Sequence, residues 1–250
     1  MRQAVRSQAV KAVQRSAAVL AWNGTPVRVR GRNTAVRPAF ASVEELVGEH
    51  FAMRSTPDHM NRGSLLETIR LLEERSATIL ETGSSAWGTN SSRLFDDYVA
   101  RFGGELVTVD IRIQPLLHLR RDLSPRSQIV CDDSVRFLRR WVRDNPSRRV
   151  DLVYLDSYDL DPGAPTPAAV HGLLELDAIR PALRDGSLLL VDDTPSSVDF
   201  FSEPERAQAA RFAESTGLVP GKGMLIDVYL GNDPSVTKIH HGYQALYRFD

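Results

Sequence analysis

The chain has only one cysteine among its 250 residues, Cys131, so it forms neither an internal disulfide nor a zinc site built from several cysteines. This cysteine usage is typical of reducing compartments, and we expect a cytoplasmic protein. Apolar runs such as Leu152–Leu155 and Leu188–Val191 are far shorter than the roughly 18–20 residues of a membrane-spanning helix. The sequence therefore predicts no membrane association.

Acidic residues are absent from the first 43 positions, which contain eight of the 31 basic residues. The other positions contain 23 basic and 32 acidic residues, so the chain of net charge −1 has a main body of formal charge −9. A protein that binds nucleic acid through its main domain needs a basic face for the phosphates. The charge distribution thus argues against nucleic acid as a partner.

The first 40 residues differ in character from the rest. Residues 23–38 are rich in Gly, Pro, Asn and Arg without periodicity, which predicts a linker or an extended surface segment. The pattern of residues 1–22 predicts an amphipathic arm. It is a docking or homo-oligomerisation helix, an organelle transit peptide or a disordered segment. Apolar residues recur in this arm at helical spacing, at Val5, Ala9, Val13 and Ala17. We therefore divide the chain into a basic arm and linker, 1–40, and one globular domain, 41–250.

The globular domain begins with helical patterns and continues with short apolar runs that alternate with helix-like segments. Ser42 and Glu45 form a capping box before a first helix, and a second helix is expected over 64–75. Five strands are expected at 77–81, 106–110, 128–131, 152–156 and 187–192. Such alternation predicts an α/β fold, a Rossmann-like doubly wound sheet that is mostly parallel and covered on both faces.

The last third of the chain predicts a C-terminal antiparallel hairpin. Its two strands are expected at 223–230 and 238–249, joined by a turn over 231–234. With the five parallel strands, the hairpin gives a seven-stranded sheet.

Every predicted strand ends in a carboxylate or runs directly into one. These acidic residues are Glu81, Asp110, Asp132, Asp133, Asp156, Asp192 and Asp193. Each one taken alone can simply cap the following helix. Ligands of open parallel sheets, however, bind beyond the carboxyl ends of the strands, so these positions are also the candidate site.

The first strand is followed by Gly83 and Gly88, which let the backbone turn sharply and approach a ligand closely. The dinucleotide fingerprint G-x-G-x-x-G and the phosphate-binding Gly-Lys-Ser/Thr sequence are both missing. Cofactors with a diphosphate are therefore not expected.

These residues resemble the class I S-adenosylmethionine-dependent methyltransferases. Glu81-x-Gly83, with Ser84 and Gly88, resembles the first motif of that family, which surrounds the methionine part of the cofactor. The resemblance implies that Asp110 holds the ribose hydroxyls and that the adenine contacts are made by Asp132 or Asp133, with Ser134. The two glycines stand five residues apart where the family commonly has four, so the loop is one residue longer.

Within that superfamily, Asp156 and the pair Asp192-Asp193 resemble the divalent-metal site of the metal-dependent O-methyltransferases of the catechol and macrolide-sugar types. Three hard oxygen ligands on adjacent strand ends suit Mg²⁺, which would lower the pKa of a bound hydroxyl. The other interpretation is that Asp192 and Asp193 only end a strand and cap a helix.

Catechol-type enzymes carry a lysine three positions after the fourth-strand aspartate, where this chain has Asp159 and no lysine nearby. A lysine base of that type is therefore excluded. His171, on the helix expected to begin at Pro167, is the predicted general base, and it is catalytic together with Asp156. A packing or hydrogen-bonding role for His171 remains the alternative.

The resemblance thus implies a methyltransferase that transfers a methyl group from S-adenosylmethionine to a hydroxyl oxygen of a small molecule, with Mg²⁺. One alternative is a metal-independent methyltransferase acting on nucleic acid or protein. The other is a catalytically inactive module that binds the cofactor.

Overall fold

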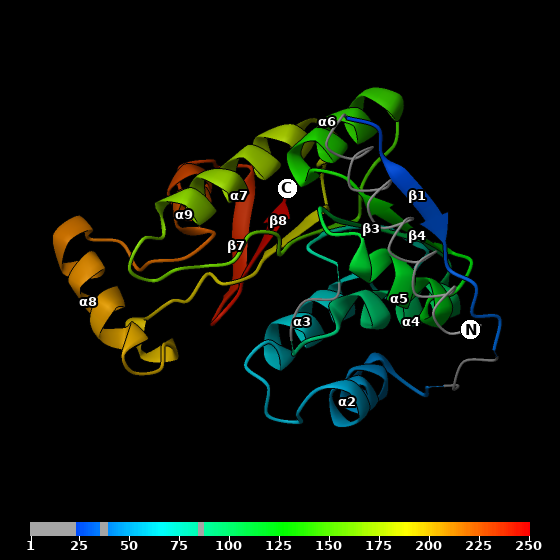
Figure 1. Ribbon diagram of the computed structural model, residues 1–250, viewed down its shortest axis with the longest axis horizontal. Helices are drawn as coiled ribbons and strands as arrows, with labels where there is room; N and C mark the ends of the chain where they lie inside the picture. The colour runs from blue at the N-terminus through cyan, green and yellow to red at the C-terminus, as the bar shows by residue number, and fades with distance from the viewer. Residues whose placement is uncertain (1–23, 36–39, 85–87) are drawn as a thin grey trace, which may run out of the picture.

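The computed structural model describes residues 24–35, 40–84 and 88–250. It contains an eight-stranded sheet in the order β1-β4-β3-β2-β5-β6-β8-β7 (Figure 1). The strands are β1 (Val27–Arg30), β2 (Ala77–Thr82), β3 (Gly104–Asp110), β4 (Ser127–Cys131), β5 (Leu152–Leu155), β6 (Leu188–Val191), β7 (Val236–His241) and β8 (Ala245–Phe249). Strands β2 to β6 pair in parallel, whereas β1, β7 and β8 pair antiparallel with their neighbours.

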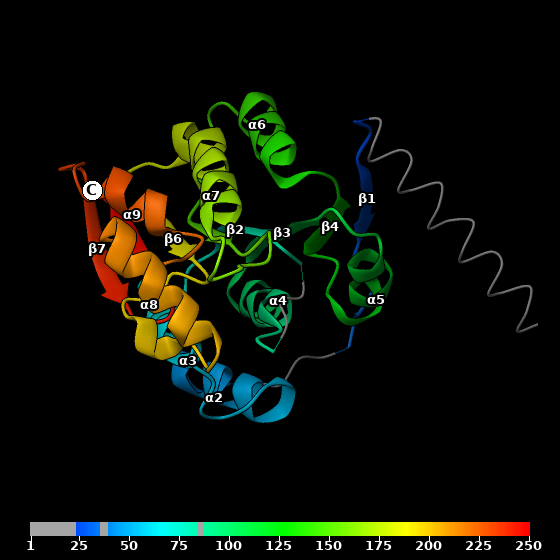
Figure 2. The same cartoon turned by 60° about the vertical axis from the view of Figure 1, so that its left-hand side comes forward.

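Helices cover both faces of the sheet, as Figures 1 and 2 show. One face is covered by α2 (Val43–Arg54), α3 (Arg62–Leu71), α4 (Ser91–Phe102) and α5 (Gln114–Asp122), and the other by α6 (Ser134–Asp144), α7 (Thr166–Ile179) and α9 (Met224–Leu230). Helix α8 (Glu205–Thr216) buries only Ala209 and lies at the outer edge in Figure 1.

The parallel strands are buried on both faces, so neighbouring residues of one strand belong to different cores. Ile79 packs in the layer with α2 to α5, whereas Leu80 packs in the layer with α6, α7 and α9. This division follows from the period of two along a strand. It explains why these strands are continuous apolar runs rather than alternating ones.

The five parallel strands and the cap of the first helix confirm the sequence predictions. Each predicted strand coincides with β2 to β6 to within two residues at either end. Ser42 caps α2, and its hydroxyl accepts a hydrogen bond from the amide of Glu45. The α/β class and the antiparallel C-terminal hairpin are confirmed as well.

The predicted location of that hairpin is wrong. Most of the segment expected to be the first strand, 223–230, forms helix α9 (Met224–Leu230). The hairpin is made by β7 and β8, which lie where only the second strand was expected. Ile226 and Leu230, four residues apart, are buried on one face of α9, which packs on α7. The apolar residues alone are compatible with a strand or a helix, and the burial of this face against α7 favours the helix. The turn between β7 and β8 includes Gly242, which hydrogen-bonds Gln244.

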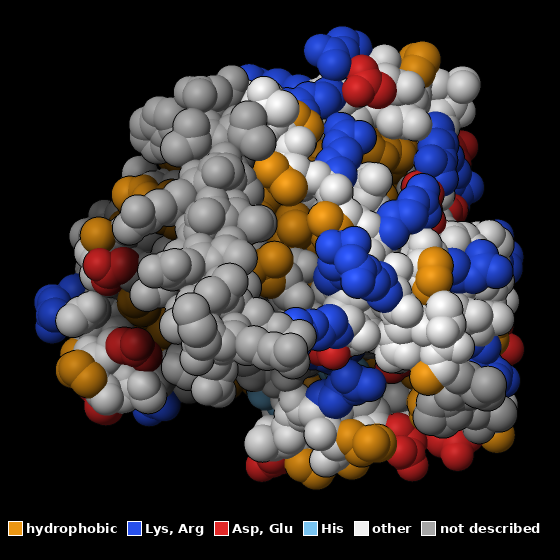
Figure 3. Space-filling view, turned by 45° about the vertical axis from the view of Figure 1, so that its right-hand side comes forward, with side chains coloured by type: hydrophobic (Ala, Val, Ile, Leu, Met, Phe, Trp, Pro, Cys, Tyr) orange, Lys and Arg blue, Asp and Glu red, His pale blue; other side chains and the backbone are white. Residues whose placement is uncertain are grey.

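The sheet has eight strands instead of seven because the segment expected to be a linker or an extended piece contributes β1. This strand pairs with β4 at the edge of the sheet, and Arg28 and Arg30 point to solvent. Figure 3 shows the side of the molecule that carries β1, where Lys and Arg side chains lie at intervals. The predictions for the amphipathic arm, including homo-oligomer formation, concern residues outside the described ones. No helix in the described residues is both long and apolar enough to cross a membrane.

Candidate active site

A cavity of about 400 Å³ opens at the carboxyl ends of β2, β3 and β5. Most of its wall is made by the first residues after these strands and by the beginning of α6. It is lined by Gly83, Val109, Asp110, Ile111, Arg112, Asp133, Ser134, Asp156, Ser157, Tyr158, Asp159 and His171. The predicted residues Gly83, Asp110, Asp133, Ser134, Asp156 and His171 therefore share one hollow, whose volume is in the usual range for small-molecule sites.

Gly83 allows the turn after β2 to pass close to β5. Its φ angle is +82°, and a Cβ there would lie 2.1 Å from the carbonyl oxygen of Asp156. Only glycine fits this position without moving the backbone, for reasons of both conformation and space.

Asp110, at the end of β3, is 6% exposed and already has a cation as a partner. The Arg112 guanidinium donates from Nε to Oδ1 at 3.0 Å and from Nη2 to Oδ2 at 2.9 Å, and its amide donates to Oδ1 as well. The Arg112 side chain is 66% exposed. A ligand that uses both carboxylate oxygens of Asp110 must therefore displace an exposed arginine.

The two aspartates after β4 have different surroundings. Asp132 is fully buried, pairs with Arg136 and Arg140, and does not belong to the described cavity lining. Asp133 caps α6 by accepting from the amide of Arg136 and also lines the cavity. Of the two residues that the sequence left open for the adenine, Asp133 is the one at the cavity.

Glu81, Ser84 and Gly88 are also missing from the described cavity lining. The buried carboxyl of Glu81 accepts hydrogen bonds from the hydroxyls of Ser91 and Ser92 at the start of α4. Burial raises the pKa of Glu81 to about 7. Ser84 is buried against the hydroxyl of Thr108. Glu81 and Ser84 are thus held by buried hydrogen bonds on either side of Gly83, and residues 85–87 lie outside the described part of the chain.

His171 comes from α7 and reaches the cavity beside α6. Its Nε2 is hydrogen-bonded to Ser134 Oγ at 3.0 Å and lies 3.5 Å from a carboxylate oxygen of the buried Glu175. The hydrogen bond with Glu175 raises the pKa of His171. The Tyr158 ring, 53% exposed, packs on the imidazole with 5.3 Å between ring centroids.

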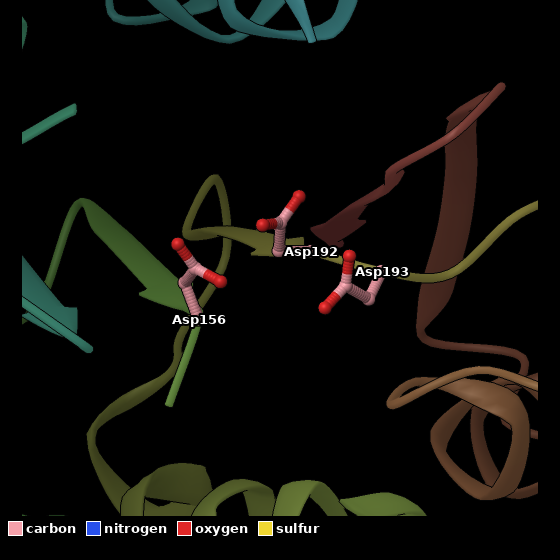
Figure 4. A group of neighbouring side chains, drawn as sticks. All are labelled: Asp156, Asp192 and Asp193. Atoms are coloured by element: carbon pink, nitrogen blue, oxygen red, sulfur yellow. The ribbon is translucent and has the colours of Figure 1, made fainter. Parts of the chain in front are cut away.

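Asp156, Asp192 and Asp193 come together at the ends of β5 and β6, as predicted (Figure 4). One carboxylate oxygen from each residue lies within 4.8 Å of the others. Asp193 has a φ of 41°, a left-handed conformation that is uncommon for residues other than glycine. We call these three residues the acidic cluster. Asp156 belongs to both the cluster and the cavity wall.

A lysine that the sequence analysis missed lies within the acidic cluster. Lys222 Nζ is 2.8 Å from Asp156 Oδ1 and 3.1 Å from Asp193 Oδ2, and the side chain is 5% exposed. The expectation that no lysine lies nearby is therefore wrong. Burial alone would lower the pKa of Lys222, but the surrounding carboxylates outweigh it and raise the pKa. The carboxylates thus stabilise the positive charge of the Lys222 side chain.

Polar side chains from distant elements complete the surroundings of the acidic cluster. Asp192 Oδ1 accepts from Asn61 Nδ2 at 3.1 Å and from Gln244 Nε2 at 2.6 Å. Tyr243, in the turn between β7 and β8, donates its hydroxyl to Asp193 Oδ1 at 2.5 Å. Asn61 and Gln244 are buried, and Asn61 Oδ1 has no hydrogen-bond partner among the described residues.

The acidic cluster fits a hard divalent cation in donor type and in charge. Its three carboxylates have a formal charge of −3, which Lys222 reduces only to −2. Burial and repulsion from Asp192 raise the pKa of Asp156, and Lys222 acts in the opposite direction. Because the three carboxylates repel one another, a further positive charge among them would stabilise their ionised form.

No protein-family model matches the sequence, and no curated protein matches it as a relative. Solved structures are similar in fold. The MycE methyltransferase of the mycinamycin biosynthetic pathway, solved with Mg, S-adenosylhomocysteine and mycinamycin VI, matches with a TM-score of 0.56 and 18% identity. The match covers 83% of this chain and 54% of the MycE chain, so this chain spans about half the length of that protein.

A second similar structure is the methyltransferase PaMTH1 of Podospora anserina, solved with bound S-adenosylhomocysteine. It matches with a TM-score of 0.51 and 13% identity, over 86% of this chain and 90% of that one. The chain therefore has the fold of S-adenosylmethionine-dependent methyltransferases, as the sequence resemblance predicts.

Proposed function

We propose that the protein transfers a methyl group from S-adenosylmethionine to a hydroxyl oxygen of a small molecule, with the help of Mg²⁺. The observation that carries this proposal is the position of Asp156, which lines the cavity and also belongs to the acidic cluster. A methyl donor in the cavity and a hydroxyl at the cluster would therefore meet at one place on the rim of the sheet.

In this proposal the cavity holds the cofactor. Asp110 accepts hydrogen bonds from the ribose hydroxyls after Arg112 has moved away, and the exposed ring of Tyr158 offers a face on which the adenine can stack. Asp133 and Ser134 lie at the same wall. Carboxylates around the cavity also favour a positively charged sulfonium group.

The acidic cluster would hold the ion through Asp156, Asp192 and Asp193. When bound, a divalent ion there lowers the pKa of an acceptor hydroxyl. Asn61 Oδ1, buried and without a partner among the described residues, is available to accept a hydrogen bond at this side of the site. Gln244 and Tyr243 hold the carboxylates of Asp192 and Asp193 in place.

We propose that His171 is the general base. Because it also lines the cavity, its alternative role is to position the cofactor, and kinetics can distinguish the two. Replacing a general base should lower kcat by about 100-fold or more and leave the KM for S-adenosylmethionine unchanged. A residue of the cofactor wall should instead raise that KM. His171→Gln therefore decides between the two roles, and Ser157→Ala, a change on the same wall, serves for comparison.

The proposed function is tested by titrating the full chain with S-adenosylhomocysteine in a calorimeter, without added metal. We expect binding of one equivalent, and no heat together with no rise in Tm would contradict the proposal. The transfer itself is tested by incubating the protein with methyl-labelled S-adenosylmethionine and a metabolite extract. Label should enter small molecules when Mg²⁺ is present and much less in excess EDTA.

A further inference from the structure

Lys222 is positioned in the acidic cluster by a backbone that is built around it. Its amide donates to the Asp193 carbonyl at 2.8 Å, which fixes the loop against the end of β6. Gly221 and Gly223 flank the lysine. A Cβ on Gly221 would lie 2.7 Å from the Asp193 carbonyl oxygen, and a Cβ on Gly223 would lie 2.3 Å from Thr194 Oγ1. Larger residues at these two positions would push the loop, and Lys222 with it, away from the cluster.

Helix α7 also leaves room for this loop. A Cβ on Gly172 would lie 2.9 Å from the Lys222 carbonyl oxygen, so glycine lets the backbone of the loop rest directly on the helix. The side chain then extends inward, where only 5% of it is exposed. The lysine is thus held by its backbone as well as by its charge.

The ammonium group contacts one carboxylate oxygen of Asp156 and one of Asp193, two of the oxygens that the acidic cluster offers to a metal ion. An ion bound at about 2.1 Å to Asp156 Oδ1 would lie no more than about 4.9 Å from Lys222 Nζ, because Nζ is 2.8 Å from the same oxygen. An ion bound to Asp193 Oδ2 would be similarly close to Lys222 Nζ, which lies 3.1 Å from that oxygen. A divalent ion and an ammonium group this close together repel each other strongly in a buried site.

We propose that Lys222 is a tethered cation that competes with the divalent ion for Asp156 and Asp193, so that the ion binds only when the lysine side chain leaves the cluster. The inference rests on the proposed metal role of the cluster. It predicts that the protein binds divalent ions more weakly than is usual for a site with three carboxylates. It also predicts that Lys222 neutralises part of the charge of the cluster when no ion is bound.

The test measures Mn²⁺ binding by calorimetry, without cofactor or acceptor, for the wild-type protein, Lys222→Met and Lys238→Met. Methionine keeps much of the length of the lysine stem and removes the charge. Lys238 pairs with Asp227, outside the acidic cluster, and is the matched control. We expect Lys222→Met to bind Mn²⁺ at least tenfold more tightly than the wild type, and Lys238→Met to bind it as the wild type does.

An unchanged or weaker Kd in Lys222→Met would overturn the inference, and so would the absence of Mn²⁺ binding by that variant. Binding of S-adenosylhomocysteine reports separately on the proposed function, because it needs no metal. A failure of the proposed cofactor binding can therefore be distinguished from a failure of this inference.

Displacement of Lys222 can also be measured on the wild-type protein, so this second test does not depend on whether a variant folds. The chain has only three lysines, so reductive methylation followed by peptide mass spectrometry can follow Lys222 and Lys238 separately. Lys222 should be protected without metal, and saturating Mg²⁺ should raise its methylation at least threefold while Lys238 stays unchanged. Equal protection of Lys222 with and without Mg²⁺, at a concentration where calorimetry shows binding, would contradict displacement. If calorimetry shows no binding at any Mg²⁺ concentration, the inference is overturned as well.

Discussion

The cavity and the acidic cluster both lie where strands end in carboxylates, but these carboxylates are neutralised in different ways. Asp110, at the cavity, pairs with Arg112, two residues away, and Asp132, behind the cavity wall, pairs with Arg136, four residues away. In the cluster, Asp156 pairs with Lys222, which is 66 residues away along the chain. Local partners are available to any folded strand end, whereas the partner of the cluster depends on the whole α/β assembly.

Arg112 and Lys222 also differ in exposure. The Arg112 side chain is 66% exposed, so solvent can take over the hydrogen bonds of its guanidinium when it leaves the buried Asp110 carboxylate. Lys222 is 5% exposed, and breaking a buried pair leaves an uncompensated charge at a cost of several kcal/mol. A ligand should therefore displace Arg112 more easily than Lys222, whose displacement requires a strongly bound ion.

The largest effect is expected from Asp156→Asn, which alters the residue shared by the cavity and the cluster. Methyl transfer should fall by about 1000-fold, because the change removes a charged ligand worth several kcal/mol at the acceptor. The measurement is kcat at saturating cofactor and Mg²⁺. Asp161→Asn, on the exposed loop before α7, should stay near the wild-type rate. Activity of Asp156→Asn within tenfold of the wild type would disprove the shared role.

Glu81 differs from the carboxylates of the cavity and of the acidic cluster. It is buried, accepts hydrogen bonds from hydroxyls and has no ion-pair partner among the described residues. Its pKa is about 7 in the fold and 4.5 when exposed, so between these values only the unfolded state releases the proton. The free energy of unfolding should therefore fall by roughly 3 kcal/mol as the pH rises from 4.5 to 7.

Urea unfolding at pH 5 and pH 8 measures this contribution, and Glu81→Gln serves as the reference because it has no proton to release. The wild type should lose stability between the two pH values relative to the variant. Parallel behaviour of the two proteins would mean that Glu81 is ionised in the folded state.

Asp110→Asn should weaken binding of S-adenosylhomocysteine by about 10-fold to 100-fold, because hydrogen bonds to a charged carboxylate contribute about 1.5–3 kcal/mol. Asp132→Asn is the matched change one strand away. It should lower Tm, since it leaves Arg136 and Arg140 without their buried partner, and should change the Kd by less than threefold. The opposite result would move the ribose contact from Asp110 to Asp132.

The smallest effect is expected from Arg112→Ala. Because the guanidinium is exposed and must leave Asp110 when the ribose binds, its removal should change the Kd for S-adenosylhomocysteine by less than threefold, towards tighter binding. Calorimetry again measures the effect. A loss of more than tenfold would show that Arg112 itself contacts the cofactor and would remove the contrast with Lys222.

Sequence reasoning located the parallel strands well, because a buried strand is an apolar run followed by a polar turn, and both signals are local. The prediction for 223–230 was wrong, because this short, mostly apolar segment, interrupted by Asp227, fits a strand or a helix equally well. Sequence reasoning also failed for Lys222, Asn61 and Gln244, which reach the acidic cluster from elements far apart in the chain. The one local signal for Lys222 is its position between two glycines.

Local patterns are enough to predict which carboxylates stand at the ends of the strands, since apolar runs mark the strands and parallel pairing brings their ends to one edge of the sheet. The groups that neutralise these carboxylates in the acidic cluster follow from the packing of the whole fold. The packing of α9 on α7 and the turn between β7 and β8 bring Lys222, Tyr243 and Gln244 to the acidic cluster. Contacts of this kind depend on the burial of distant apolar faces, which no local pattern of residues encodes.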